Sequence, residues 1–238
     1  MQERPASVTE IYRYPVKGLT AQPLERVALT VGETIPYDRA WAIENGPGRF
    51  DPEAPRHLPK VAFLMLMRDE RLATLAAEFD EETTTLTLRR DGRQVARGNL
   101  SKRIGCQMIE QFLGAYMKES LRGPPKIVSA PGHSFSDIAA KCLHIVNMAS
   151  VRDLERAAGR TIDPLRFRPN VIIDGAAPWA EFDWLDKTLD IGGAQFEVIQ
   201  RTQRCTATTV DPQTAARDMA VPAILERSRG HSDFGVYA

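Results

Sequence analysis

The stretch "TQRCTATTVDPQTAARD", residues 202–218, places a cysteine directly after an arginine among small polar and β-branched residues that predict a strand. Cys205 could be a buried filler of the core, or a thiolate that faces a ligand and is stabilised by Arg204. Adjacent strand residues point to opposite faces unless a bulge or turn intervenes, and the break at Asp211-Pro212 could supply that irregularity. The remainder of the chain has to decide between these alternatives.

Composition favours a globular protein with a small anionic ligand. The 238 residues are 43% hydrophobic and 26% charged, enough for one large domain or two small ones with a real core. Acidic and basic residues balance at 31 each, so no global field attracts nucleic acid or an anionic membrane, although a local basic pocket remains possible. We therefore expect a small-molecule substrate or ligand and no nucleic-acid partner.

The cysteines and the N-terminus predict a cytoplasmic location. Cys106, Cys142 and Cys205 are odd in number and far apart, which argues against a disulfide framework and for a reducing compartment. The first ten residues lack the sections of a signal peptide, and no apolar run approaches the roughly 18 residues that span a bilayer. No membrane association is expected.

The first hundred residues predict a small β-barrel or sandwich. Short strands are expected in "SVTEIYRYPV", "LERVALTV", "RAWAIEN", "VAFLMLMRD" and "TTLTLRRDGRQVARG", with a hairpin turn at Asp91-Gly92. Residues 68–83, "RDERLATLAAEFDEET", could be a helical turn or a strand with a long loop. We expect residues 1–100 to form this lobe and residues 101–238 to form a second domain.

The second half also predicts mainly strands, with a few flanking helices. Residues 102–118 place apolar side chains at helical spacing: Ile104, Met108, Ile109, Phe112, Leu113 and Tyr116. A helix capped by Ser150, with Asp153 completing a capping box, should end at Gly159. Strands are expected at residues 170–174, in a hairpin over 189–200, at Cys205 and from residue 233, with a short helix over 221–230.

Most familiar catalytic motifs are missing. There is no glycine-rich dinucleotide or phosphate loop, no cysteine pair at zinc spacing and no G-x-S-x-G elbow, and the histidines His57, His133, His144 and His231 are dispersed. Lys17, Arg39 and Arg168 lie at strand ends, where each alone would be a solvated charge. Brought together by the fold, they would form a pocket for a phosphorylated ligand.

The motifs taken in order resemble a known family. "IYRYPVKGL" and "YDRAWAI", followed by "RFRPNVIIDG", "WAEFDWLDKTLDIGGAQFEV", "QRCTATTVDPQT" and "HSDFGVY", are similar to successive motifs of the MOSC-domain family. The resemblance is to its two-part branch, an N-terminal β-barrel plus a MOSC domain, which includes the mitochondrial amidoxime reducing component. It covers nearly the whole chain and implies a mainly β fold with a barrel-like MOSC domain.

The resemblance implies a pyranopterin molybdenum cofactor with Cys205 as metal ligand and catalytic residue, since a soft thiolate suits such a metal. It implies reduction of N-hydroxylated substrates such as amidoximes and hydroxylamines. Asn170 would orient the pterin or the neighbouring strand. The residues implied in cofactor binding are Lys17, Gly18, Arg39, Arg168, Asn170, Gln203, Arg204 and Tyr237.

Two other functions stay open from the sequence. Cys205 could hold the cofactor or a persulfide in a carrier or sulfur-transfer module without turnover, or it could be structural in a β-rich scaffold. An enzyme would need a separate electron-donor protein, ferredoxin-like or cytochrome b5-like, because the sequence has no cysteine cluster for an iron–sulfur centre.

The sequence also departs from the family pattern. Ala215 stands where relatives usually have glycine after "DPQT", which predicts a changed turn, while Asp211 should fix the loop that follows the cysteine. Most members continue beyond "FGVYA" into a further hairpin. Since this sequence stops at Ala238, either the chain is truncated or a strand edge is left open there.

Overall fold

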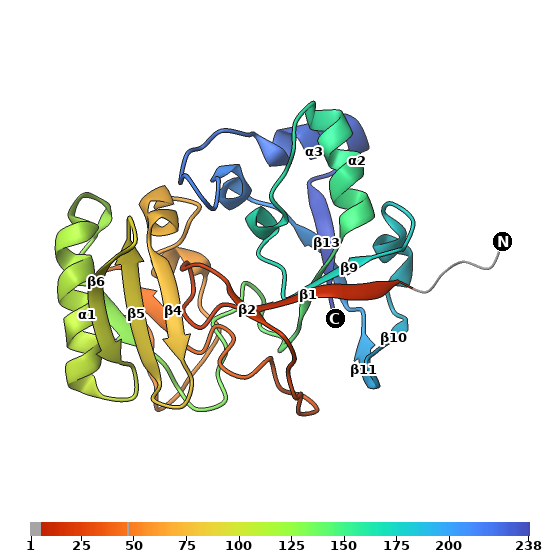
Figure 1. The fold of residues 1–238 in the computed structure, drawn as a ribbon. Coiled ribbons are helices and arrows are strands. Elements are labelled where there is room, and N and C mark those ends of the chain that lie inside the picture. Colours follow the sequence, from red (N-terminus) through yellow and green to blue (C-terminus); the bar gives the residue numbers. More distant parts are fainter. Residues whose placement is uncertain (1–5, 47) are drawn as a thin grey trace.

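A six-stranded sheet joins the two ends of the sequence. The computed structural model describes residues 6–46 and 48–238. The apolar run Val171–Asp174 forms β9, which pairs in parallel with β8 (His144–Asn147) and antiparallel with β1 (Ser7–Arg13). The strand order is β12-β13-β8-β9-β1-β2, with β2 at Gln22–Leu24, β12 at Gln200–Gln203 and β13 at Asp233–Tyr237. The first strand of the chain therefore lies within the sheet of the C-terminal half (Figure 1).

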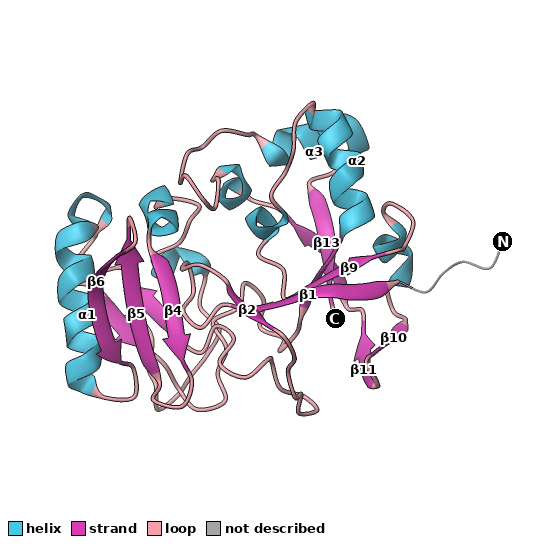
Figure 2. Ribbon diagram, viewed as in Figure 1, coloured by secondary structure: helices cyan, strands magenta, loops and turns pink. Residues whose placement is uncertain are grey.

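The two faces of this sheet carry separate cores. On one face, α2 (Met148–Ala158) and α3 (Val221–Arg229) pack their apolar side chains with Val146 and Phe234. The other face buries Ile145 and Val236 beneath the hairpin of β10 (Thr188–Ile191) and β11 (Ala194–Glu197). Helices thus cover one side of the sheet, and a β-hairpin covers part of the other (Figure 2).

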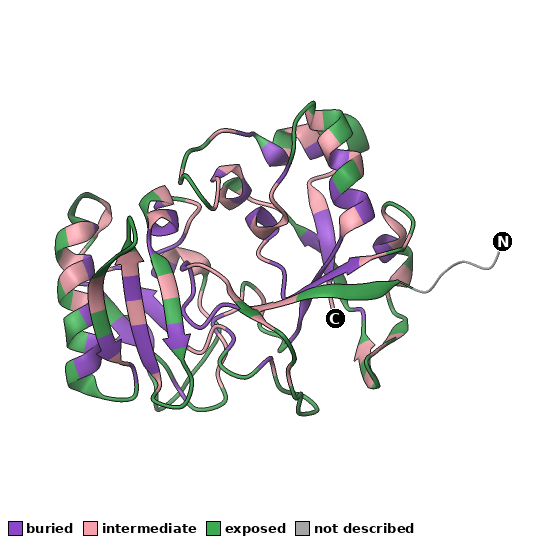
Figure 3. Cartoon of the chain, in the orientation of Figure 1, coloured by how far each residue is buried: buried purple, intermediate pink, exposed green. Residues whose placement is uncertain are grey.

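A second lobe is built around a three-stranded antiparallel sheet. Its strands are β4 (Ala76–Asp80), β5 (Thr85–Arg90) and β6 (Arg93–Asn99), and α1 (Arg103–Tyr116) packs against them. Two further strands, β3 (Ala42–Glu44) and β7 (Lys126–Val128), pair beside this sheet. Figure 3 shows buried residues concentrated where strands meet helices, with the outward helix faces exposed.

The expected mainly β class is confirmed, including the Asp91-Gly92 hairpin. Among the described residues, no sheet closes into a full barrel. The domain division near residue 100 stays a prediction, and hydrogen bonding crosses it between β1 and β9. No helix in the described part of the chain is long and apolar enough to cross a membrane. Short 3-10 helices complete the fold: η1 (Lys60–Ala62), η2 (Glu70–Thr74), η3 (Lys118–Ser120), η4 (Pro164–Phe167), η5 (Ala180–Trp184) and η6 (Thr206–Thr209).

Two expected strands are wrong. "LERVALTV" continues β2 only to Leu24, and "VAFLMLMRD" forms η1 followed by turns, with one isolated bridge from Phe63 to Glu44. Consecutive residues Phe63 to Met65 are all buried, a pattern that no strand with one solvated face can satisfy. The ambiguous residues 68–83 contain both alternatives, η2 and then β4.

The helix predictions hold, but their details change. α1 buries Cys106, Ile109 and Leu113, whereas Ile104 and Met108 are 69% and 54% exposed and lie off the packed face. α2 begins one turn earlier than expected because Asn147 caps it by accepting a hydrogen bond from the Ala149 amide. Gly159 ends α2 as predicted.

Ser150 is not the cap of α2. Its hydroxyl instead donates to Glu181 Oε2 at 2.9 Å and accepts from the Trp179 amide at 2.7 Å. The Ser150 side chain is thereby committed to η5 and is not available to the first turn of its own helix.

The alternative of an open edge at the C-terminal strand is wrong. β13 pairs with β12 on one side and with β8 on the other, and Ala238 exchanges backbone hydrogen bonds with Leu143. Gly235 allows this interior position, because a Cβ there would come within 2.6 Å of His144 Nε2 and the Ile145 carbonyl. The strand edges of the sheet are β12 and β2 instead.

Candidate functional site

A cavity of about 300 Å³ lies where the two lobes meet, next to the start of η6. Its walls come from both lobes, including the Met65–Met67 segment of one lobe and the residues around Cys205 of the other. All the residues singled out from the sequence as site candidates line it: Lys17, Gly18, Arg39, Arg168, Asn170, Gln203, Arg204, Cys205 and Tyr237.

Backbone geometry at the ends of the strands directs these side chains inward. Arg39 and Arg168 both adopt left-handed backbone, with φ of 52° and 55°, a conformation that costs a non-glycine residue about 1 kcal/mol or more. Gly18 has φ 87°, and a Cβ there would lie 3.0 Å from the Leu64 carbonyl oxygen. The wall of the cavity therefore contains strained positions in three separate loops.

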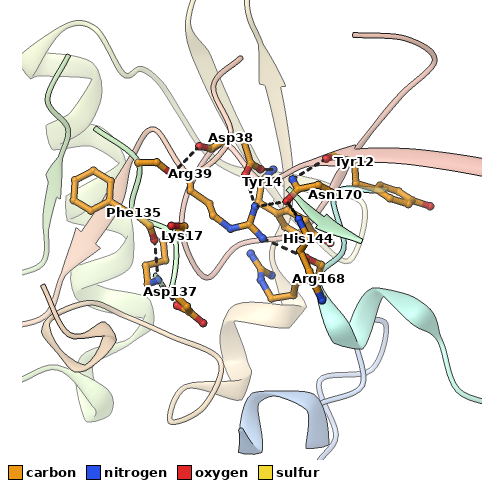
Figure 4. A network of polar contacts seen from close by, with 12 residues as sticks. Tyr12, Tyr14, Lys17, Asp38, Arg39, Phe135, Asp137, His144, Arg168 and Asn170 are labelled. Atoms are coloured by element: carbon orange, nitrogen blue, oxygen red, sulfur yellow. Dashed lines mark hydrogen bonds and ion pairs between the residues drawn. The ribbon is translucent and has the colours of Figure 1, made fainter. Parts of the chain in front are cut away.

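Arg39 is held by a carboxylate. Its guanidinium forms an ion pair with the buried Asp38, donates to Asn170 Oδ1 and to the Arg168 carbonyl at 3.2 Å each, and lies over the ring of Tyr14. Burial alone would lower the pKa of Arg39, but the charge of Asp38 raises it above its ordinary value. Arg39 stays charged and joins the two lobes (Figure 4).

Lys17 is likewise compensated. It is buried, and its ammonium donates to Asp137 Oδ1 at 2.5 Å and to the Phe135 carbonyl at 2.8 Å (Figure 4). Burial lowers the pKa of Lys17, and Asp137 opposes that change. The Asp137 side chain is half exposed. Partial burial of its carboxyl would raise the pKa, but the charge and hydrogen bond of Lys17 hold that pKa well below its usual range. The solvated lysine considered from sequence is therefore wrong.

Arg168 and Arg204 lack such partners. Arg168 Nη1 donates to the Leu19 carbonyl at 2.8 Å, and Arg204 Nη2 donates to the Phe167 carbonyl at 2.7 Å. Within the described residues, neither guanidinium forms an ion pair, and Arg168 Nη2 and Arg204 Nε are buried without a hydrogen-bond partner. Burial lowers the pKa of Arg168 to about 10 and also lowers that of Arg204. Both arginines therefore add positive charge to the site that no ion pair compensates.

His144 connects them. It lies in β8, almost fully buried, with Nδ1 3.3 Å from the Arg168 carbonyl and Nε2 3.5 Å from Arg204 Nη1. Because a carbonyl only accepts, Nδ1 carries the proton and Nε2 presents its lone pair to the guanidinium. Burial, and then the nearby arginines, lower the pKa of His144 well below 6.5, so the imidazole is neutral.

Asn170 makes its contacts with the protein. Its Oδ1 accepts from Arg39 Nη1 and from the His144 amide at 3.1 Å, and its Nδ2 donates to the Tyr12 carbonyl at 3.1 Å. These contacts tie Asn170 to β1 and β8, and whether it orients the pterin or the neighbouring strand stays a prediction. Tyr237 lies nearby, with its ring 5.4 Å from that of His144, and burial raises the pKa of its phenol to about 12.

Cys205 is not on a strand, as the sequence had suggested, but at the turn that follows one. β12 ends at Gln203 after a register shift against β13, and Cys205 is the first residue before η6. This turn brings both Arg204 and Cys205 to the cavity wall, so the irregularity occurs at the cysteine itself and not at Asp211. Asp211 does fix the following loop by accepting from the Gln213 and Thr214 amides.

Sequence reasoning missed several residues that line the cavity or support its wall. Asp38 and Asp137, which compensate the cations, and His144, which joins the arginines, carry no local pattern that marks them. Cys142 also lines the cavity, but it is buried, and burial raises the pKa of its thiol to about 12. Cys142 therefore remains protonated, while Cys205 is a partly exposed thiol at the same cavity.

The protein alone offers an incomplete ligand set for a metal. The described residues contain no group of three or more histidine, cysteine or acidic side chains placed to hold an ion. Cys205 could supply one sulfur to a metal whose other ligands belong to a bound organic group.

Comparison with known families covers both halves of the chain. The family model for the MOSC N-terminal beta barrel domain matches residues 5–120, and the MOSC domain model matches residues 130–238. The chain belongs to the MOSC-domain family, in its two-part form. The expectation from the sequence motifs is confirmed.

Individual relatives are distant. Mitochondrial amidoxime-reducing component 1 is 25% identical in Homo sapiens and 23% identical in Mus musculus, and each alignment covers 91% of this chain and 69% of the relative. Molybdenum cofactor sulfurase of Drosophila melanogaster is 35% identical over 94% of this chain, but the match covers only 30% of that longer protein.

Proposed function

We propose that this protein binds a pyranopterin molybdenum cofactor and reduces N-hydroxylated small molecules. One observation carries the proposal: two guanidiniums without carboxylate partners, Arg168 and Arg204, each with one buried and unbonded nitrogen, lie at the same cavity as the partly exposed thiol of Cys205. Unpaired buried charge is costly, and an anionic group of the ligand would compensate it. The similarity to proteins named for amidoxime reduction and for the molybdenum cofactor supports this choice of ligand.

The residues present fit such a group. Arg168 Nη2 and Arg204 Nε are buried donors that have no acceptor among the described residues, as a phosphate site requires. The described lining contains six basic side chains, Lys17, Arg39, Lys60, Arg166, Arg168 and Arg204, against the single carboxylate of Asp137. Cys205 provides the soft donor that a dithiolene-bound metal accepts.

Each residue would have a defined part in binding. Arg168 and Arg204 would hold the phosphate, and Cys205 would bind the metal. Lys17, Gly18, Arg39 and Asn170 would fix the pterin side of the cavity, with Gln203 and Tyr237 on the remaining wall. When bound, the cofactor supplies two-electron chemistry at its metal.

The chemical change is a two-electron reduction. An amidoxime takes up two electrons and two protons, its N–O bond breaks, and an amidine and water form. Neutral His144 keeps its proton at Nδ1 against the Arg168 carbonyl, and Tyr237 keeps its phenolic proton at neutral pH, because its pKa is raised to about 12. The electrons would come from a separate ferredoxin-like or cytochrome b5-like protein. A cytoplasmic location remains part of this proposal.

Metal content tests the ligand assignment. The protein would be produced in a host that makes the cofactor, and molybdenum per chain would be measured for wild type, Cys205→Ala and Cys142→Ala. We expect Cys205→Ala to lose about tenfold or more of the metal. Cys142→Ala, the matched control at the same cavity, should retain it because that thiol stays protonated. Equal molybdenum in wild type and Cys205→Ala would overturn the assignment.

Turnover separates an enzyme from a cofactor carrier. A reduced dye and an amidoxime should give the amidine with the loaded wild-type protein and not with the Cys205→Ala variant. A loaded protein that is inert toward several N-hydroxy compounds, yet transfers its cofactor to an apo-enzyme, would be a carrier.

A further inference from the structure

Arg217 connects the two walls of the cavity from outside. On one side, its Nη1 donates to the Thr206 carbonyl at 3.1 Å and to Thr209 Oγ1 at 2.9 Å, both in η6. On the other side, its Nη2 donates to the carbonyls of Leu66 and Met67 at 3.2 and 3.0 Å. One guanidinium therefore bonds the cysteine turn of one lobe to the Met65–Met67 segment of the other.

A carboxylate strengthens the second side. Glu70 Oε2 accepts from Arg217 Nη2 at 3.0 Å and from Nε at 3.3 Å. The Arg217 side chain is 34% exposed, yet all three of its nitrogens are bonded to protein groups. A single ion pair stabilises an ordinary surface arginine only slightly and leaves its side chain mobile. Hydrogen bonds from all three nitrogens of Arg217 therefore indicate a specific contact.

The loop that carries Arg217 is held by its own contacts within the same lobe. Arg217 forms a β-bridge with Val210, and the Asp211 amide donates to the Ala216 carbonyl at 2.8 Å. The buried Arg166 pairs with both Asp211 and Asp218 at 2.7 Å. The position of the Arg217 guanidinium is therefore set by the same loop that follows Cys205.

We propose that Arg217 is a positioning residue that fixes the gap between the cysteine turn and the Met65–Met67 segment, and thereby limits the size of molecules that reach Cys205. Both bonded segments line the cavity: Cys205 and Ala207 belong to the cysteine turn, and Met65, Leu66 and Met67 belong to the segment of the other lobe. The inference that this gap selects substrates by size rests on the proposed function. The width of the gap is a property of the protein alone and can be tested without cofactor or substrate.

The test uses thiol accessibility and requires no molybdenum. The full chain, purified without cofactor, would be treated with iodoacetamide or with a bulky pyrene maleimide, and modification of each cysteine would be followed by peptide mass spectrometry. For Arg217→Ala, we expect the ratio of pyrene maleimide to iodoacetamide rates at Cys205 to rise about fivefold or more. The buried Cys106, which lies away from the cavity, reports general loosening, and its modification rate should change by less than about twofold.

Two further variants keep the test decisive. Arg217→Lys retains the charge but cannot bond both walls, so its ratio should also rise, and this variant replaces Arg217→Ala if the latter fails to fold. Arg152→Ala removes a surface guanidinium paired with Asp174 and should leave the ratio unchanged. An unchanged ratio in the Arg217 variants, or an equal increase at Cys106, would overturn the proposal. Neither result would affect the molybdenum assignment, which depends on metal content.

Discussion

Replacing Arg168 with methionine should separate anion binding from folding. The Arg168 guanidinium packs on the ring of Tyr14 at 4.1 Å and has no carboxylate partner among the described residues. Burial lowers its pKa to about 10 from an ordinary 12.5. At about 1.4 kcal/mol for each pH unit, keeping this group charged costs the folded protein about 3 kcal/mol. In phosphate-free buffer, Arg168→Met should therefore lose less than about 1 kcal/mol of unfolding free energy, because methionine retains packing and removes the unpaired charge.

Stabilisation by an added anion should, in contrast, depend strongly on Arg168. A pyrophosphate concentration ten times its Kd stabilises the binding state by about 1.4 kcal/mol, which raises Tm by about 3–6 °C for a chain of this size. Wild type should show this rise by differential scanning calorimetry, measured against potassium chloride of equal ionic strength. Arg168→Met should lose most of it. Arg152→Met, which removes a surface arginine paired with Asp174, should keep it.

The refuting result is specific. An equal rise of Tm in wild type and Arg168→Met, or an equal rise in chloride, would mean that the anion acts through general screening and not at this guanidinium. A large loss of stability of Arg168→Met in phosphate-free buffer would show instead that the guanidinium is compensated within the protein.

Three further predictions concern stability. Ala215 has φ 60°, so Ala215→Gly should raise the unfolding free energy by about 0.5 kcal/mol, as relief of left-handed strain exceeds the glycine entropy cost; a decrease in urea unfolding would contradict this. Burial raises the pKa of Glu181, so the stability that this residue contributes is fully present below about pH 4.5 and is lost as pH rises through its folded-state pKa. The Tm of Glu181→Gln relative to that of wild type should therefore increase from pH 4.5 to pH 7. A difference in Tm that stays constant over this range would refute the prediction. Lys17→Met should cost about 1–3 kcal/mol in urea unfolding because the Phe135 carbonyl loses its donor, whereas no change would indicate a solvated lysine.

Local patterns predicted the elements of the fold but not their partners. The hairpin at Asp91-Gly92 and the end of α2 at Gly159 follow from backbone preferences of single residues, so the sequence shows them directly. The pairing of β1 with β9 joins residues more than 150 positions apart, and no local signal specifies it. The same limit explains the wrong cap of α2: Ser150 is a good cap residue, but the distant Glu181 and Trp179 engage its hydroxyl.

The candidate site shows the same division. The motifs identified four of the six lining cations and the cysteine, and the structure places them at one cavity. Which cations are compensated could not be predicted, because Asp137 lies 120 positions from Lys17 and its approach depends on the tertiary fold. In the sequence, His144 is one of four dispersed histidines, yet its position in β8 puts it between two arginines.

The placement of the site follows from the way in which the sheet is assembled. The Tyr12 amide donates to the Asn170 carbonyl at 2.7 Å, and Asn170 Nδ2 returns a bond to the Tyr12 carbonyl, so the pairing that completes the sheet also brings Arg168 beside the loop after β1. Arg39 and Arg168 hold left-handed backbone there, and Arg168 and Arg204 bury charge that no carboxylate in the described chain compensates. Folding therefore concentrates unfavourable free energy at one cavity. An anionic ligand would lower that free energy more at Arg168 and Arg204 than at the compensated Lys17–Asp137 pair of the same cavity, so the proposed affinity would follow from charge that the fold leaves uncompensated.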